Sequence, residues 1–263
     1  MLFGGKIAVV TGAASGLGAA IARELSARGA VVYLADIDFQ KAQQTAREIG
    51  GVPVRLDVSN VIQVETVIRE ITQKHEALDI VINNAGIVCP SDELLRFGPE
   101  EWRKILSVNL SGAIAGSLAA YSVMRHQRFG HIINIGSLSG LIPVPFLGPY
   151  TVSKAALTGF TLGLAAEAEP DGVHVSLVCP GNLDTGMARP SSVLPGVSPA
   201  DAAQRIVKGI SRHERIIVFP LYARVMWWLE RINPVFLRTW NREIVRRHAQ
   251  REAERQVPLS PAA

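Results

Sequence analysis

The chain has 263 residues, 48% of them hydrophobic, which is enough to bury the core of one large domain. Charged residues make up 19%, which excludes a disordered tail, and no apolar run reaches the roughly 18–20 residues of a membrane span. The N-terminus shows no basic region followed by a cleavage site, so no secretory signal is expected. Two cysteines, Cys89 and Cys179, are too few for a disulfide framework. A reduced, cytoplasmic protein is therefore expected.

Short β-branched runs alternate with longer helical patterns along the chain. Seven strand-like runs cover residues 6–11, 31–35, 52–56, 78–82, 131–135, 173–178 and 216–219. Helical patterns cover residues 16–28, 40–49, 61–75, 100–127, 150–168 and 199–211. The strand-like runs are apolar throughout, which is typical of strands covered on both faces. The alternation predicts an α/β fold: a doubly wound, seven-stranded parallel sheet with helices on both faces.

The net charge of +4 is concentrated at the C-terminal end. Residues 221–263 hold eight Arg and four Glu, which leaves 19 basic and 19 acidic residues before them. Three of the four Trp also lie in this segment. This shift predicts two parts, a neutral body over residues 1–220 and a basic, Trp- and Arg-rich helical extension over residues 221–263.

A glycine-rich turn, TGAASGLG at residues 11–18, follows the first strand and opens the first helix. Its glycines allow the backbone to approach a pyrophosphate, which then lies at a helix N-terminus. The alternative is a plain turn, but the order of strand, glycines and helix favours a dinucleotide site.

Asp36 ends the second strand, eighteen residues after Gly18. A carboxylate there accepts hydrogen bonds from ribose hydroxyls and repels a 2′-phosphate. The turn contains no Lys or Arg, and Ile37 follows Asp36, so NAD is favoured over NADP. The alternative is that Asp36 only caps the next helix, a role for which Asp38 is also placed.

Tyr150 and Lys154 are four residues apart in one helical pattern and therefore share a face. An ammonium near a phenol favours the phenolate and lowers its pKa, so the pair suits proton exchange with an alcohol or ketone. Ser137 ends the fifth strand, and Asn109 lies in the helix after the fourth. Both belong to the edge at which open α/β sheets bind ligands. No His, Cys, Asp and Glu cluster at ligand spacing is seen, so no metal is expected.

These motifs together resemble the short-chain dehydrogenase/reductase family, of the single-domain, Tyr-dependent type with a Rossmann-like sheet. The resemblance covers about residues 6–219. It is carried by TGAASGLG at 11–18, Asp57-Val58, NNAG at 83–86, Asn109, Ser137, YTVSK at 150–154 and PGNLDT at 180–185. One departure is Gly136, which stands where the family often has the first of two adjacent serines. We therefore assign the serine that orients the reacting oxygen to Ser137, and we interpret Ser139 as a turn residue.

The resemblance implies a role for each matching residue. Tyr150 would be the acid/base, Lys154 would bind the nicotinamide ribose and lower the Tyr150 pKa, Ser137 would orient the reacting oxygen, and Asn109 would anchor a relay water. The implied NAD-binding residues are Gly12, Ser15, Gly16, Leu17, Gly18, Asp36, Asp57, Val58, Asn83, Ala85, Gly86, Tyr150, Lys154, Pro180, Gly181, Leu183 and Thr185.

The predicted function is hydride transfer between NAD(H) and a secondary alcohol or ketone. The segment 138–149 carries three prolines and no charge, which indicates a hydrophobic substrate (steroid-like, retinoid-like or long-chain) or a loop that packs on a neighbouring helix. Residues 187–197 are expected to form a lid. A non-catalytic NAD-binding scaffold or redox sensor is the alternative function.

The extension has three interpretations. Residues 221–240 interleave apolar residues with arginines, and Pro234 is expected to divide them into two helices, with a charged helix over 242–255. The favoured interpretation is that the Trp face packs against the chain's own body or a second subunit of a homodimer or homotetramer. Peripheral contact with a membrane is the second interpretation. Nucleic-acid binding ranks last, because the body lacks a basic pattern.

Overall fold

The computed structural model describes residues 3–89, 91–185, 195–233, 235, 238–246 and 250. Its centre is one sheet of seven strands in the order β3-β2-β1-β4-β5-β6-β7, and every pairing is parallel. The strands are β1 Ile7–Thr11, β2 Val31–Asp36, β3 Val52–Arg55, β4 Ile80–Asn83, β5 Gly130–Ile135, β6 Val173–Pro180 and β7 Ile216–Phe219. The predicted doubly wound sheet is confirmed, with strand ends shifted by at most two residues.

The α-helices from α1 to α8 lie between and after these strands. They are α1 Gly16–Ala27, α2 Phe39–Ile49, α3 Val61–His75, α4 Pro99–Leu106, α5 Ala113–Gln127, α6 Gly148–Ala168, α7 Pro199–Ile210 and α8 Leu221–Ile232. A π-helical turn, Ser107–Gly112, joins α4 to α5 in one continuous helical stretch.

Side-chain caps mark the N-termini of several helices. Asp38 accepts a hydrogen bond from the Lys41 N–H and begins α2, which leaves Asp36 free of the capping role.

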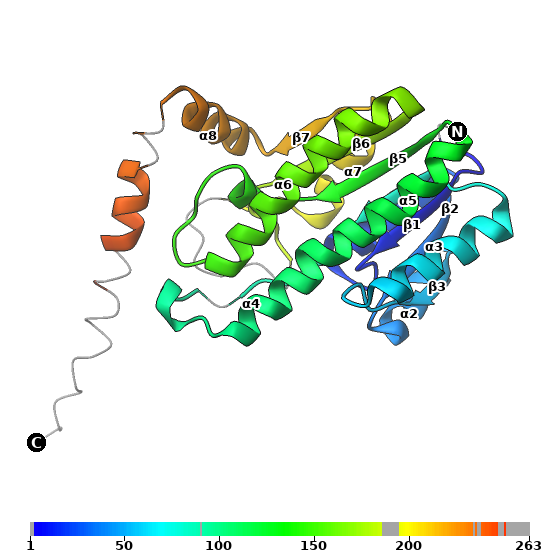
Figure 1. The fold of residues 1–263 in the computed structure, drawn as a ribbon, viewed down its shortest axis with the longest axis horizontal. Coiled ribbons are helices and arrows are strands. Elements are labelled where there is room, and N and C mark those ends of the chain that lie inside the picture. The colour runs from blue at the N-terminus through cyan, green and yellow to red at the C-terminus, as the bar shows by residue number, and fades with distance from the viewer. Residues whose placement is uncertain are drawn as a thin grey trace, which may run out of the picture.

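The helices form a layer on each face of the sheet (Figure 1). Residues of α1 and α7 pack on one face and share a core with alternate residues of β1, β2 and β4. Residues of α3, α5 and α6 pack on the other face and share a second core with the intervening strand residues. Because both faces are covered, the central strands are apolar at successive positions rather than at alternate ones.

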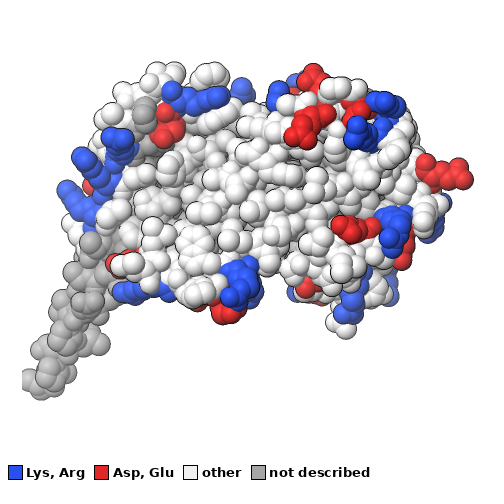
Figure 2. Space-filling view, in the orientation of Figure 1, with Lys and Arg blue, Asp and Glu red and all other residues white. Residues whose placement is uncertain are grey.

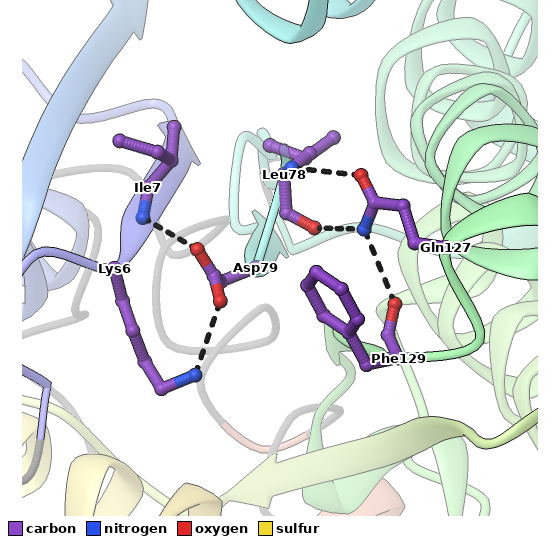
Figure 3. A network of polar contacts seen from close by, with 6 residues as sticks. All are labelled: Lys6, Ile7, Leu78, Asp79, Gln127 and Phe129. Carbon is purple, nitrogen blue, oxygen red and sulfur yellow. Dashed lines mark hydrogen bonds and ion pairs between the residues drawn. The ribbon is translucent and has the colours of Figure 1, made fainter. Parts of the chain in front are cut away.

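The amino ends of the strands are tied together by polar side chains (Figure 3). Asp79 accepts from Lys6 Nζ at 3.0 Å and from the Ile7 N–H at 2.8 Å, and so links β1 to the start of β4. The Gln127 amide accepts from the Leu78 N–H and donates to the Leu78 carbonyl, each at 2.9 Å. These contacts fix the register of the central strands at the end opposite to their carboxyl ends.

One described helical stretch, Pro99–Gln127, is long and apolar enough to cross a membrane by length and composition alone. It packs against α3 and α6, and 44% of its most apolar window is buried inside the protein. Core helices of compact domains have the same composition, so we interpret this stretch as part of the helical layer.

The C-terminal extension begins with α8, which ends at Ile232, two residues before Pro234. A second helical run covers residues 238–246. Trp228 is 54% exposed because α8 turns its other face to the body, so the body leaves this part of the Trp face open. Packing of this face against a second subunit, the other covering expected, stays a prediction. The predicted lid, residues 187–197, lies mostly outside the described residues, as do residues 251–255 of the predicted charged helix.

Three histidines meet at the amino ends of β5 and β6. His131 and His174 are register partners, and the His174 ring stacks on the His213 ring with centroids 3.8 Å apart. His131 is 4% exposed, and its Nε2 lies 2.7 Å from Ser176 Oγ. Burial, helped by the charges of His213 and His174, lowers the pKa of His131 from 6.5 to about 3.

This burial predicts a loss of stability in acid. As pH falls from 6.5 towards 3, the unfolded His131 takes up a proton while the folded one stays neutral, so the free energy of unfolding falls by as much as roughly 4 kcal/mol. Urea unfolding of His131→Phe across this range should give a flatter pH dependence than the parent. The control His126→Phe changes an exposed histidine and should keep the parental slope. An unchanged slope in His131→Phe would contradict the assignment.

Candidate active site

The predicted site residues gather at the carboxyl ends of five neighbouring strands. These ends are Thr11, Asp36, Asn83, Ile135 and Pro180. The chain reverses its direction of winding between β1 and β4, because β1 pairs with β2 on one side and with β4 on the other. Open parallel sheets bind ligands at such a switch point.

The glycine turn lies directly over this point. Gly12 has φ +65°, and a Cβ built on it would come 2.8 Å from the Ala85 Cα. A Cβ on Gly18 would lie 2.0 Å from the Gly12 carbonyl oxygen, so both positions require glycine. The α1 helix starts at Gly16 with no acidic residue in its first turn and no side-chain cap, and its positive dipole end therefore faces the turn. Ser15 and Gly16 are exposed there, whereas the Leu17 side chain is buried in the core.

Asn84 connects the two sides of the switch point, a role that the sequence did not reveal. Its Nδ2 donates to the carbonyl oxygens of Thr11 and Gly12, at 2.9 and 3.2 Å. In return, Thr11 Oγ1 accepts from the backbone N–H groups of Asn84 and Ala85, both at 3.0 Å. These four bonds hold the glycine turn against the loop that carries Ala85 and Gly86.

The Asn83 side chain turns away from this edge, although Asn83 was predicted to line the cofactor. It is 4% exposed, and its Nδ2 donates to Ser117 Oγ at 3.0 Å and to Asn134 Oδ1 at 2.8 Å. Asn134 Nδ2 in turn donates to Thr161 Oγ1 at 3.0 Å. This buried network joins β4 and β5 to α5 and α6. The Asn83 side chain therefore stabilises the packing of the sheet on these helices and does not face the candidate site.

Asp36 faces the glycine turn at the end of β2. Its Oδ2 accepts from the Ala14 N–H and its Oδ1 from the Asp38 N–H, both at 2.9 Å. Each oxygen keeps a lone pair with which to accept from another donor. Arg55 is the register partner of Asp36 on β3, but its guanidinium lies over the Phe39 ring, 5.4 Å from the ring centre. The sequence pattern gave no sign of this nearby cation.

Ser139, Ser137 and Tyr150 form a chain of hydroxyl groups. Ser139 donates to Ser137 Oγ with its hydroxyl at 2.9 Å and with its backbone N–H at 3.2 Å. Ser139 lies in the 3-10 turn Leu138–Gly140, as expected of a turn residue, but it is 6% exposed and its two bonds also orient Ser137. Burial raises the pKa of Tyr150, and a hydrogen bond with Ser137 opposes this rise.

Lys154 lies beside Tyr150 and is bonded to the backbone of β5. Lys154 is 4% exposed, its Nζ donates to the Ile135 carbonyl at 2.7 Å, and it is 5.8 Å from the centre of the Tyr150 ring. Burial lowers the pKa of Lys154 to about 8. Burial is the largest influence on the Tyr150 pKa in this geometry, and the lowering expected from Lys154 stays a prediction. Tyr150 is therefore a neutral phenol at pH 7, suited to donate a proton.

Asn109 occupies the π-helical turn, a departure from regular helix that is frequent at functional sites. Its side chain is fully buried and pairs with Ile87 through both groups, Nδ2 to the carbonyl and Oδ1 from the N–H, each at 2.8 Å. Its Nδ2 also donates to Ser153 Oγ at 3.2 Å. A Cβ on Gly86 would lie 3.3 Å from Asn109 Oδ1 and 3.6 Å from Lys154 Nζ, so Gly86 leaves the space between them open.

The remaining predicted cofactor residues border the same edge. Asp57 Oδ1 accepts from the N–H and hydroxyl of Ser59. Val58 is buried under the π-helical turn, where a Cβ on Gly112 would come 2.7 Å from its carbonyl. Thr185 faces the glycine turn, with its Cγ2 3.7 Å from a Cβ built on Gly16, and Leu183 pairs with Val197 in an isolated bridge.

Tyr222 of α8 reaches the loop after β6, a contact that the sequence did not indicate. Its hydroxyl accepts from the Asn182 N–H at 2.9 Å, and a Cβ on Gly181 would come 2.6 Å from this oxygen. The Gly181 N–H donates to the Phe219 carbonyl at 2.8 Å. The first helix of the extension thus helps to position the loop that follows Pro180.

Both cysteines are buried, and both influence the pKa of Tyr150. Burial raises the pKa of Cys179 to about 12, which keeps its thiol protonated and unreactive as a nucleophile. Within the described ranges, no group of three or more His, Cys, Asp and Glu side chains is arranged to hold a metal ion.

Comparison with known proteins identifies the family. A family model described as short chain dehydrogenase matches residues 6–193. The 3-oxoacyl-(acyl-carrier-protein) reductase FabG of Escherichia coli (strain K12) is 39% identical over 191 residues, which cover 72% of this chain and 78% of FabG. An uncharacterized oxidoreductase of Staphylococcus aureus (strain USA300) is 34% identical over 224 residues, 83% of this chain and 96% of its own. The chain therefore belongs to the short-chain dehydrogenase/reductase family of oxidoreductases.

A solved structure has the same fold. A short chain dehydrogenase/reductase from Burkholderia phymatum, in complex with NAD, superposes with a TM-score of 0.82. The match covers 90% of this chain and 96% of that one, at 24% sequence identity. The Rossmann-like arrangement predicted from the strand and helix pattern is confirmed.

The buried ammonium of Lys154 predicts a trade-off between the stability and the activity of this protein. Lys154→Met should abolish turnover and raise the free energy of unfolding by about 1–3 kcal/mol at pH 7, since a buried charge is removed. The pKa of Lys154 is about 8 when folded against an ordinary 10.5, so the gain should be full below pH 8 and vanish as pH approaches 10.5.

Chemical unfolding at pH 7 and pH 10 measures this gain. The control Lys104→Met replaces an exposed lysine of α4 and should show no such pH dependence. A destabilised Lys154→Met at pH 7 would show that the Ile135 hydrogen bond outweighs the cost of burying the charge.

Proposed function

We propose that this protein transfers a hydride between NAD(H) and a ketone or secondary alcohol, with Tyr150 as the acid/base. The observation that carries the proposal is the hydroxyl chain from Ser139 through Ser137 to Tyr150, with the buried Lys154 alongside. A scaffold or redox sensor without turnover, the alternative function, has no need of this arrangement.

The residues present fit a dinucleotide. The turn at Gly12 and Gly18 has no room for side chains, and the uncapped N-terminus of α1 supplies the positive potential that a pyrophosphate requires. Asp36 would hold the adenosine ribose, and Lys154 the nicotinamide ribose. The Asp36 carboxylate repels a 2′-phosphate and so supports NAD, although Arg55 lies on the neighbouring strand. When bound, this cofactor supplies the hydride chemistry.

The protein's own part is to orient the reacting oxygen and to move one proton. Ser137 would donate a hydrogen bond to the substrate oxygen, with its own oxygen oriented by Ser139. Tyr150 would donate its phenolic proton to the developing alkoxide, a transfer that contributes typically 10²–10⁴-fold. A raised Tyr150 pKa keeps the phenol protonated at pH 7, which supports reduction of a ketone as the direction served by this geometry.

An apolar rim, formed by Leu94 and Leu95 beside the start of α6, supports an apolar substrate. Leu94 and Leu95 are 61% and 97% exposed, and Leu94 contacts Gly148 at the start of α6. The Asp92 N–H donates to the Phe146 carbonyl at 3.1 Å and joins this rim to the uncharged loop after Ser137. Leu138 and Ile142 of that loop instead pack on α8, so only part of the loop is available to a ligand.

A 3-oxoacyl thioester on an acyl-carrier protein is the second candidate substrate, favoured by the 39% identity to a reductase with that name. Its reacting group is a ketone on an apolar chain, so the same residues would serve. A panel of free apolar ketones and carrier-bound 3-oxoacyl groups, followed by absorbance of the reduced cofactor, separates the two candidates. Binding of NAD(H) without turnover of any member would favour the scaffold.

Loss of the Tyr150 hydroxyl tests the proton donor. Tyr150→Phe should lower kcat by about 10²–10⁴-fold and leave NAD(H) binding nearly intact, because only the acid is removed. Stopped-flow absorbance and a fluorescence titration measure the two quantities. The control Tyr33→Phe removes a hydroxyl that bonds His75 outside the site and should retain near-normal turnover. Near-normal turnover in Tyr150→Phe would disprove the assignment.

Removal of the Asp36 charge tests the cofactor preference. Asp36→Asn keeps an oxygen for the Ala14 N–H but loses the repulsion of a 2′-phosphate, so the ratio of kcat/KM for NAD(H) to that for NADP(H) should fall on the order of tenfold or more. Thermal unfolding of the variant controls for loosening of the glycine turn. A parent protein that already prefers NADP(H) would show that Arg55, rather than Asp36, decides the choice.

A further inference from the structure

The α8 helix presents an apolar stripe to solvent. Leu221, Val225, Trp228 and Ile232 are 73%, 48%, 54% and 75% exposed. Their spacing places all four on one face of the helix. They line a shallow hollow together with Leu229 and the stem of Arg224. A contiguous exposed apolar surface of this kind marks a site of interaction.

The opposite face of α8 is fixed to the body, so the stripe cannot turn inward. Ala223 is fully buried and packs with Leu138 and Ile142 of the loop after β5. Tyr222 bonds the Asn182 N–H, as described above, and Met226 packs on the same cluster. The apolar stripe is therefore a permanent feature of the folded chain.

Arginines accompany the stripe on both described helices of the extension. Arg224 and Arg231 flank it on α8, and Arg238, Arg242 and Arg246 follow at spacings of four residues on the next helical run. All five are exposed, against two Glu, Glu230 and Glu243, on the same helices. Figure 2 shows Lys and Arg side chains gathered at the end of the molecule where Figure 1 places these helices. The body before residue 221 is balanced in charge, so this end is distinctly cationic.

We propose that this surface, defined by Leu221, Val225, Trp228, Ile232 and the five arginines, binds an anionic lipid membrane at the interface. A face of Trp and aliphatic residues beside Arg matches the requirement of such a surface, in which apolar side chains enter the acyl boundary and cations meet anionic headgroups. Trp is also the side chain that favours the headgroup level.

A second copy of the chain fits this surface less well. A symmetric contact would bring the arginines of two copies together, and like charges in proximity oppose association. A stable interface also takes about 20–30 residues on each side, whereas the stripe offers four apolar ones. The charge pattern therefore selects an anionic lipid surface over self-association.

The extension that carries this surface contacts the loop between Ser137 and Tyr150. Asn241 Nδ2 donates to the Pro143 carbonyl at 3.2 Å, and Ala223 packs beside Ile142. Both contacts are made with the loop between Ser137 and Tyr150. A membrane bound by the extension would therefore lie next to this loop. An apolar compound dissolved in the bilayer would then be close to the candidate site.

Vesicle flotation of the full-length protein tests the proposal. The parent should float with phosphatidylglycerol-containing vesicles, and much less with pure phosphatidylcholine, and its flotation should fall as salt rises. Its tryptophan fluorescence should shift to the blue in the first case. Arg238→Gln, Arg242→Gln and Arg246→Gln should each weaken binding on the order of fivefold. The double variant Trp228→Ser, Ile232→Ser should weaken it at least about tenfold.

Matched control variants lie on α3. Ile62→Ser changes a side chain that is 76% exposed, and Arg69→Gln removes an exposed cation, so both should float like the parent. Size-exclusion chromatography of the Trp228→Ser, Ile232→Ser variant runs in parallel. If the parent fails to float and this variant changes its oligomeric state, the stripe is a subunit interface and the proposal is wrong. Equal flotation with both vesicle types, or unchanged flotation of the variants, would also overturn it.

Discussion

Four hydrogen bonds between Thr11, Gly12, Asn84 and Ala85 hold the two sides of the switch point together, and the rest of the site depends on them. Parallel strands have no hairpin to join their carboxyl ends, so side chains must fix the separation of the loops that follow β1 and β4. The Asn84 amide and the Thr11 hydroxyl do this across 73 residues of sequence. The glycine turn can then approach Ala85 closely, because neither Gly12 nor Gly18 brings a side chain into the contact.

Desolvation decides the chemistry on the other side of the switch point. Burial disfavours the charged form of both side chains, so the pKa of Tyr150 is raised and that of Lys154 is lowered to about 8. The hydrogen bond from Lys154 to the Ile135 carbonyl and the contact of Ser137 with Tyr150 offset this cost only in part. The candidate site therefore places a phenol and an ammonium where burial destabilises the charged form of each, at a cost in stability.

The C-terminal extension packs directly against the loops that border the candidate site. Tyr222 bonds the loop after β6, and Ala223 packs on the loop after β5, so one short helix contacts both segments that border the site. The outer face of the same helix remains apolar and exposed.

The sequence by itself determined the fold class, the strand and helix positions to within about two residues, and the family. Periodicity and glycine placement are local properties, and they do not depend on which side chains meet later. Local pattern did not reveal that Asn84 bridges β1 and β4, that Asn83 turns inward to Ser117 and Asn134, or that Ser139 orients Ser137. Nor did it reveal that burial raises the pKa of Tyr150 or that the body leaves Trp228 exposed. Only the tertiary structure decided these points, because hydrogen-bond partners, desolvation and exposure arise from residues that are distant in the chain and meet only in the folded protein.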